Sequence, residues 1–180
     1  PSGPVQYGAR IGSTALNGRL GNSPFAFSTP GGQIVGQQFA LNNPALRLGR
    51  SASPIAFNAT RLTGNLASRG SGGSFTGLHG TIATVPILLS DGSGKWSVKG
   101  SAVSLTGSAL IADRDPNPRF YPLRSDNLKL TIGGDYVRAT GGLKHEGTLV
   151  TDVSIEHRLS TGGGHAILDV PGLTFGPNLQ

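Results

Sequence analysis

The chain of 180 residues contains no cysteine, so it can hold neither a disulfide framework nor a thiolate metal site. It also lacks methionine and has only two glutamates, Glu146 and Glu156. Strong helix formers are therefore few, while glycine, serine and threonine are many, and this composition favours strands and turns. No run of 18 apolar residues and no charged-then-apolar leader occurs in it. Because it starts at Pro1, we expect a single β-rich segment, residues 1–180, from a longer chain that carries any anchor or export signal elsewhere.

The charge is positive, with 15 basic against 9 acidic residues and a formal net charge of +6. Such a balance is compatible with nucleic-acid or phospholipid-headgroup partners. The basic residues are scattered singly, however, and one tryptophan, three tyrosines and seven phenylalanines are too few to form stacking platforms among them. We therefore predict no nucleic-acid partner.

The stretch VPILLSDGSGKW, residues 85–96, resembles the start of a phosphate-binding loop without completing it. Leu89 stands where such a loop needs its first glycine, and Trp96 follows Lys95 where a serine or threonine would hold magnesium. The following KWSVKG alternates like a strand. We predict that DGSG is the turn of a β-hairpin.

Other catalytic and metal-binding patterns are missing as well. No serine lies in a G-x-S-x-G elbow, and the histidines at 79, 145, 157 and 165 form neither an i,i+4 pair nor H-E-x-x-H. His157 and His165 flank a turn, but two histidines without a third ligand make a poor zinc site. We predict no catalytic residues, no metal site, no cofactor and no enzymatic activity.

A strand pattern recurs along the chain. LNGRL (16–20), LTGNL (62–66) and LHGTI (78–82) are copies, LTGSA (105–109) is a weaker one, and LKLTIG and TLVTDVSIEH repeat the alternation. Alternate residues of a strand share a face, so the leucines and glycines face one side and the polar residues the other. The spacing between copies is irregular, which indicates a repeated strand type and not a strict solenoid period.

These patterns predict an all-β fold of long, mostly antiparallel strands. We expect strands near 5–20, 32–41, 45–49, 55–67, 74–84, 95–112, 127–140, 148–159 and 165–175, separated by glycine- and proline-rich turns. Their apolar face needs a covering: a second sheet, closure of the sheet on itself, or a curled open sheet with an apolar groove. The pattern alone favours a filled core over an open groove.

The second half of the chain resembles a known family. VPILLSDGSGKW, DRDPNPRFYPL, IEHRLSTGGGHAILDVPGLTFGP and the final NLQ are similar to YdbH-like proteins of Gram-negative bacteria, within the AsmA-like, TamB-related group, some labelled "dicarboxylate transport domain". LRLGR followed by RLTGNL extends the likeness more loosely to the first half, so that it covers most of residues 45–180.

The resemblance implies a long periplasmic protein anchored in the inner membrane through a segment outside this chain. Its sheet would curl into a U-shaped apolar groove that carries phospholipid acyl chains between the inner and outer membranes, with a small outer-membrane lipoprotein as partner. With this resemblance we expect an open groove in place of a filled core. The residues expected to line it are Leu16, Leu20, Leu62, Leu66, Leu78, Ile82, Leu105, Leu128, Leu130, Ile132, Val153 and Ile155.

One alternative stays open from another functional class: a filled β-sandwich or β-solenoid module of a cell-surface or envelope protein, with no lipid ligand. In either case the sheet would continue in the parent chain. We therefore predict an unpaired strand at each end of the segment, where exposed edges invite pairing.

Overall fold

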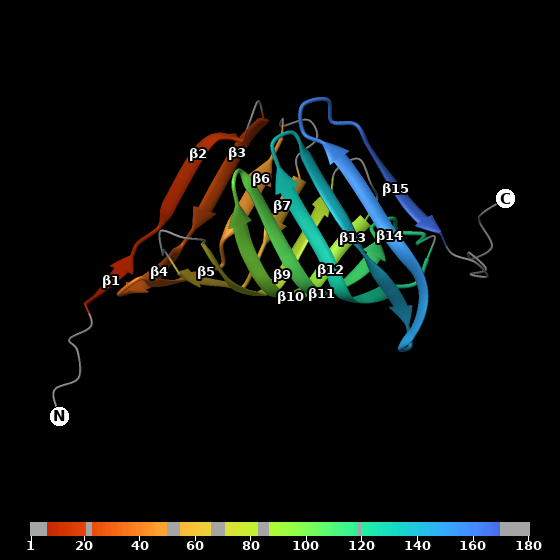
Figure 1. Cartoon of the computed structure of the whole chain (residues 1–180), viewed down its shortest axis with the longest axis horizontal. Coiled ribbons are helices and arrows are strands. Elements are labelled where there is room, and N and C mark those ends of the chain that lie inside the picture. The colour runs from red at the N-terminus through yellow and green to blue at the C-terminus, as the bar shows by residue number, and fades with distance from the viewer. Residues whose placement is uncertain are drawn as a thin grey trace.

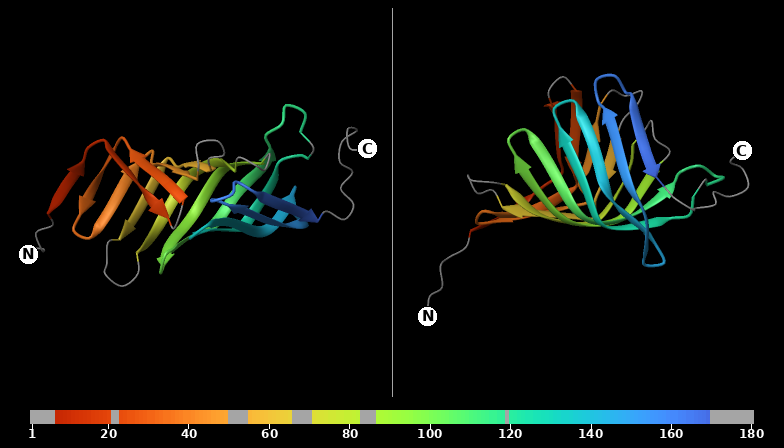
Figure 2. Two further views of the ribbon diagram at one scale, coloured as in Figure 1. Left: turned by 90° about the horizontal axis from the view of Figure 1, so that it is seen from above. Right: turned by 45° about the vertical axis from the view of Figure 1, so that its right-hand side comes forward.

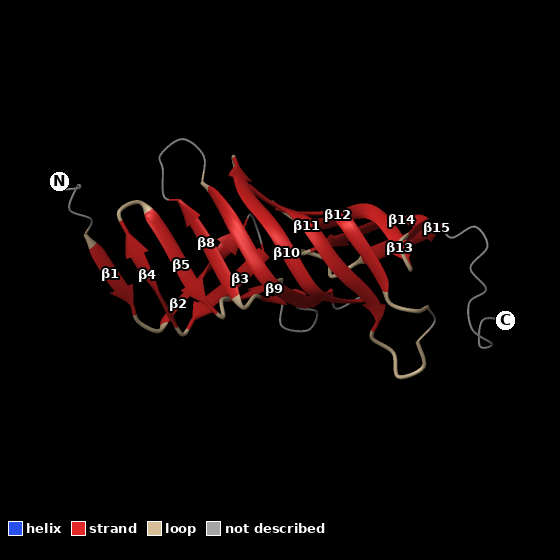
Figure 3. Cartoon of the chain, turned by 90° about the horizontal axis from the view of Figure 1, so that it is seen from below, coloured by secondary structure: helices blue, strands red, loops and turns tan. Residues whose placement is uncertain are grey.

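A computed structural model describes residues 7–20, 23–49, 55–65, 71–82, 87–118 and 120–169. These residues form fifteen strands in one antiparallel sheet, and none of them is helical (Figure 1). The sheet is curled and not closed, which confirms the predicted fold class. It is elongated, with strands lying obliquely across its long axis (Figure 3).

The first eight strands are four long strands, each interrupted near its middle. They are β1 (Gly8–Ile11) with β2 (Thr14–Leu20), β3 (Ser23–Thr29) with β4 (Gly31–Val35), β5 (Gln38–Asn42) with β6 (Ala45–Leu48), and β7 (Ile55–Asn58) with β8 (Arg61–Asn65). The next six strands are longer and mostly continuous, and the last one is short. They are β9 (Gly72–Ile82), β10 (Ile87–Lys99), β11 (Ala102–Asp113), β12 (Leu123–Gly133), β13 (Tyr136–His145), β14 (Thr148–Arg158) and β15 (Gly164–Asp169).

The sheet forks at β9. One half of β9 pairs with β8 and leads through β5 and β4 to β1, and the other half pairs with β7 and leads through β6 and β3 to β2. Each long strand therefore pairs with the next along the chain, so the sheet is a simple antiparallel meander. β1 and β2 at one end and β15 at the other each pair on one side only among the described strands, which confirms the predicted edges.

A line of bends crosses the sheet where the strands are interrupted. Asn43 and Asp91 have positive φ angles of 44° and 49°, and Gly77 has 63°. Backbone hydrogen bonds join neighbouring bends, from Asn43 N to Thr60 O at 2.9 Å and from Thr60 N to Thr76 O at 2.9 Å. We call this line the crease. It divides the sheet into a first wall, which contains β2, β3, β6 and β7, and a second wall, which contains β1, β4, β5 and β8.

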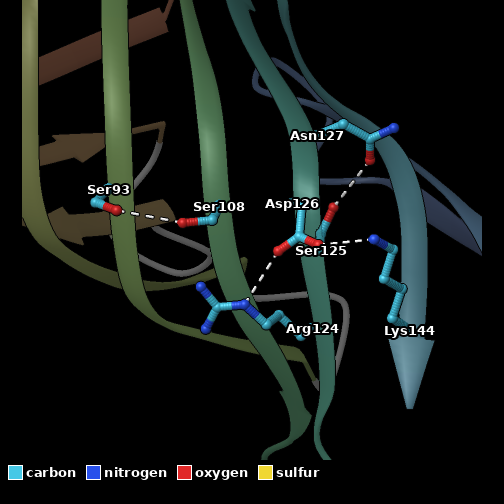
Figure 4. A network of polar contacts seen from close by, with 7 residues as sticks. All are labelled: Ser93, Ser108, Arg124, Ser125, Asp126, Asn127 and Lys144. Atoms are coloured by element: carbon cyan, nitrogen blue, oxygen red, sulfur yellow. Dashed lines mark hydrogen bonds and ion pairs between the residues drawn. The ribbon is translucent and has the colours of Figure 1, made fainter. Parts of the chain in front are cut away.

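The crease continues through the longer strands as β-bulges, which bend a strand sharply. The register of β12 shifts between Arg124 and Lys129, beside a polar network in Figure 4. Asp126 accepts hydrogen bonds from Lys144 Nζ at 2.8 Å and Arg124 Nε at 3.1 Å, and Asn127 Oδ1 accepts one from Gly142 N at 2.9 Å. The strands β10 to β14 cross the crease, so one half of each extends the first wall and the other half extends the second wall. The sheet is therefore a U in cross-section (Figure 2).

The glycines of the three repeats lie beneath aromatic rings. A Cβ at Gly18 would overlap Phe25, one at Gly64 would overlap Trp96, and one at Gly80 would overlap Phe57. Each ring comes from a neighbouring or nearby strand and lies on the concave face. The repeated motif thus makes room for a ring inside the curl.

The core lies on the concave face, between the walls. Around β10 to β14 the packing leaves a cavity of only about 20 Å³, lined by residues of both walls such as Phe57 and Ile155. The buried apolar side chains form one cluster: Leu48, Ile55, Phe57, Ala59, Phe75, Leu78, Ile87, Leu89, Ala109, Ile111, Leu123, Leu128, Leu130, Ile132, Val137, Ala139, Leu143, Val153, Ile155 and Leu159. This part of the interior is filled, although the sheet itself is open.

Several predicted boundaries are wrong. DGSG is not a hairpin turn, because β10 runs through it to Lys99 and absorbs the extra residue as a bulge between Ser90 and Ser93. The segment predicted as one strand over 127–140 is split by a turn at Gly134, whose φ is 44°. Strand β3 was not predicted at all, and residues 170–175 of the last predicted strand lie outside the described residues.

Candidate functional site: an apolar pocket on the concave face

An open pocket of about 330 Å³ lies between the two walls, next to the packed part of the core. Asn58 is its one polar lining residue among the described residues. The others are Phe25, Phe27, Pro44, Ala45, Leu46, Leu48, Phe57, Ala59, Leu62, Phe75, Leu78, Trp96, Val98, Val103, Leu105, Leu130 and Ile132. Its chemistry is therefore that of a hydrocarbon-binding surface.

The two walls contribute different strands to this pocket. The first wall supplies Phe25 and Phe27 from β3, followed by leucines of β6. The second wall supplies Val98 from the end of β10, Val103 from the start of β11 and Ile132 from the end of β12. Val98 is 36% exposed, so the pocket is open to solvent on this side.

Trp96 forms part of the pocket's lining without bringing in an unpaired polar group. Its indole N–H donates to the backbone carbonyl of Thr63 at 2.7 Å. Its ring lies over Gly64 and against Phe39, with the ring centroids 6.0 Å apart. The ring can therefore present carbon to the pocket while its nitrogen is satisfied by the sheet.

The predicted lining residues are brought together only in part. Five of them line the open pocket: Leu62, Leu78, Leu105, Leu130 and Ile132. Three more, Leu128, Val153 and Ile155, face the filled interior. Leu128 and Ile155 line the small cavity, and Val153 is 2% exposed.

The other four predicted residues lie nearer the edges or cannot be placed. Leu16 is 56% exposed on β2, opposite Phe27 and on the same face as the pocket. Leu20 ends β2 and Ile82 ends β9, while Leu66 lies outside the described residues.

Sequence reasoning missed the aromatic part of the pocket. Phe25, Phe27 and Trp96 line it, and none of them was predicted. Apolar and polar residues do alternate in PFAF and KWSV. PFAF begins with a proline and lies among serines, which disfavours a strand prediction there. KWSV was expected to follow a hairpin turn at DGSG and not to lie inside a long strand.

The rims of the two walls meet at one place beside the pocket. Asp135, in the turn between β12 and β13, accepts hydrogen bonds from Ser160 Oγ at 2.6 Å and Ser160 N at 2.8 Å, and these bonds lower the pKa of the carboxyl. Ser23, at the start of β3, is 1% exposed. Its hydroxyl lacks a well-formed hydrogen bond but lies close enough to Asp135 to contribute to this pKa shift.

His157 faces the interior near this rim. It pairs with Gly164 across β14 and β15, on the same face as Val137, and it is 1% exposed. Burial lowers the pKa of its imidazole, because the charged form loses its hydration. His165 lies one register position away and is exposed, so the two histidines do not share a face.

Among the residues that the structure describes, no three His, Cys, Asp or Glu side chains gather where they could hold a metal ion. The same part of the chain has no helix that is long and apolar enough to cross a membrane.

Comparison of the chain with protein-family models, curated proteins and solved structures finds no match. The resemblance to YdbH-like proteins stays a prediction.

Proposed function

We propose that this chain is a segment of a conduit that carries phospholipids between the inner and outer membranes of a Gram-negative bacterium. The acyl chains would lie in the apolar groove, and the polar headgroup would stay in water at its open side. The inner-membrane anchor would lie in another part of the protein, and a small outer-membrane lipoprotein would receive the lipid.

The observation that carries this proposal is the open pocket, which has a single polar lining residue in the part of the chain that the structure describes. Its volume of about 330 Å³ is at the lower end of the range for small-molecule sites, about 300–1,000 Å³. It suits part of one acyl chain. Each methylene that leaves water for such a surface contributes about 0.8 kcal/mol.

The length of the sheet limits what the segment does alone. The meander has eleven successive strand positions, so ten spacings of about 4.8 Å give roughly 48 Å along the groove axis. A bilayer including its headgroups is about 40–45 Å thick, so this segment is too short to bridge two membranes. It would form one section of a longer path.

Passage along the whole groove requires the walls to separate. Around β10 to β14 the remaining cavity is only about 20 Å³, which leaves no room for a chain. The walls are continuous through the crease and are held together by the apolar cluster between them, so an acyl chain that enters the open pocket would have to displace part of this packing.

The filled region also supports a second candidate, a structural β-module with no lipid ligand. Native mass spectrometry of the chain purified from bacterial envelopes separates the two functions. A conduit segment is expected to retain phospholipid that is released by organic solvent. Protein that takes up no phospholipid, even when incubated with phosphatidylethanolamine vesicles, would favour the structural module.

A further inference from the structure

The face of the second wall that is turned away from the apolar pocket carries a polar hollow. It consists of two adjoining cavities of about 820 and 240 Å³, which share Gln33, Ala40 and Arg61. Its floor is made of small side chains such as Thr63 and Ser74, whose hydroxyl oxygens lie 2.7 Å apart. The larger cavity, about 820 Å³, lies within the range of small-molecule sites, about 300–1,000 Å³.

The register of the sheet shows how this hollow is built. Cross-strand partners place one row of side chains on this face, in the order Arg10, Gln33, Ala40, Thr63, Ser74 and Lys95. The row crosses six strands, so five spacings of about 4.8 Å separate Arg10 from Lys95 by roughly 24 Å. The hollow is thus an extended trough across the strands.

Its charge has one sign. Arg10, Arg61 and Lys95 line the trough, and no aspartate or glutamate among the described residues does. The ion pairs that the structure gives for the described residues involve Arg124, Arg138 and Lys144 instead. The cations of the trough are therefore available to an anionic ligand.

The spacing of these cations selects the kind of anion. A single phosphate could not contact groups strung along about 24 Å, so the ligand is extended. Between the cations the trough offers amides and hydroxyls, which pair with hydroxyl groups of a ligand. It offers no stacking platform for bases, because the nearby rings of Phe39 and Trp96 belong to the register row of Gly64 and Gly73 on the opposite face.

We propose that this trough binds an acidic oligosaccharide. Arg10, Arg61 and Lys95 would pair with its carboxylates, while Gln33, Thr63 and Ser74 would bond its hydroxyls. The site is independent of the proposed lipid groove, since it lies on the other face of the sheet. A chain with both sites would hold lipid inside and be tethered to an acidic glycan outside.

The test is isothermal titration calorimetry of the chain with hexagalacturonate and with its methyl ester, the same oligosaccharide without the charges. We expect the acid to bind and the ester to bind at least tenfold more weakly. The double variant Arg61→Ala/Lys95→Ala should lose at least tenfold in affinity. The matched control Arg47→Ala/Lys99→Ala removes the same charge from exposed positions that line neither cavity, and it should change affinity less than twofold.

A second variant, Ser74→Gln, keeps the charge of the trough and fills its floor with a larger side chain, so it should also weaken binding. It provides the test if the double variant Arg61→Ala/Lys95→Ala folds poorly. The proposal is overturned if the parent chain does not bind hexagalacturonate, if the ester binds as well as the acid, or if the control loses as much as Arg61→Ala/Lys95→Ala. Tighter binding of a thymidine oligonucleotide than of hexagalacturonate would also overturn it, in favour of a nucleic-acid site.

Discussion

The indole N–H of Trp96 donates a 2.7 Å hydrogen bond to the backbone carbonyl of Thr63, although 33 residues separate the two in the chain. The bond passes over the strand between them, since Thr63 lies on β8 and pairs with β9, and β9 pairs with β10, which carries Trp96. It is made possible by Gly64, which has no side chain under the ring. One aromatic residue thus joins three neighbouring strands, β8, β9 and β10, next to the pocket.

Trp96→Phe keeps a ring over Gly64 but removes the donor. We expect the free energy of unfolding to fall by about 0.5–1.5 kcal/mol, the usual net contribution of one hydrogen bond, with some added loss from the smaller ring. Urea denaturation followed by circular dichroism measures this. An unchanged midpoint would mean that water replaces the indole at Thr63 without cost.

Gly64→Ala tests the role of the repeated glycine. The new methyl group would overlap both Trp96 and Phe39, so we expect a loss of about 1–3 kcal/mol, as for other overpacked positions. Gly12→Ala is the matched control, because nothing lies within 4 Å of the Cβ there. Its effect should stay within about 0.5 kcal/mol. Equal losses in the two variants would show that backbone freedom, and not space for the ring, explains the glycine.

The all-β class could be predicted because alternation is a local property of the sequence. The face on which Leu62, Leu78 and Leu130 lie follows directly from the period of two. Whether that face is filled or open could not be predicted, because it depends on how closely the two walls approach, and the crease that brings them together consists of scattered bends such as Asn43 and Asp91. The aromatic half of the pocket was missed for a related reason. Its rings pack over glycines of other strands, and only the fold shows this.

His157 predicts a pH dependence of stability. Its pKa is lowered in the folded state below the ordinary value of 6.5, so the unfolded chain binds a proton first as the pH falls. Stability is therefore complete above pH 6.5 and is lost as the pH decreases through that value toward the folded-state pKa.

The check is the free energy of unfolding at pH 7.5 and at pH 5.5. We expect a clear decrease for the parent chain and a smaller decrease for His157→Gln. His165→Gln, at an exposed position on β15, should keep the parent's pH dependence. If His157→Gln shows the same decrease as the parent, another group is responsible.

The last prediction concerns the lipid groove and uses two neighbouring residues on opposite faces of β10. Val98 lines the apolar pocket and is 36% exposed, while Ser97 lines the polar hollow and is also exposed. An aspartate at either position stays hydrated, so both variants should fold. In contrast, Leu130→Asp would bury an unpaired charge at a residue only 2% exposed and should unfold the chain.

Val98→Asp places a carboxylate and its water in the path of an acyl chain, which would forfeit several methylenes at about 0.8 kcal/mol each. We expect crosslinking to a phospholipid with a diazirine in its acyl chain to fall at least tenfold, since about 1.4 kcal/mol corresponds to one factor of ten. Ser97→Asp should crosslink like the parent, because its charge is on the other side of the sheet. Circular dichroism of both variants shows whether the strands are intact. If folded Val98→Asp crosslinks as well as Ser97→Asp, the pocket does not hold the acyl chain, and the filled interior around β10 to β14 then identifies the segment as a structural module.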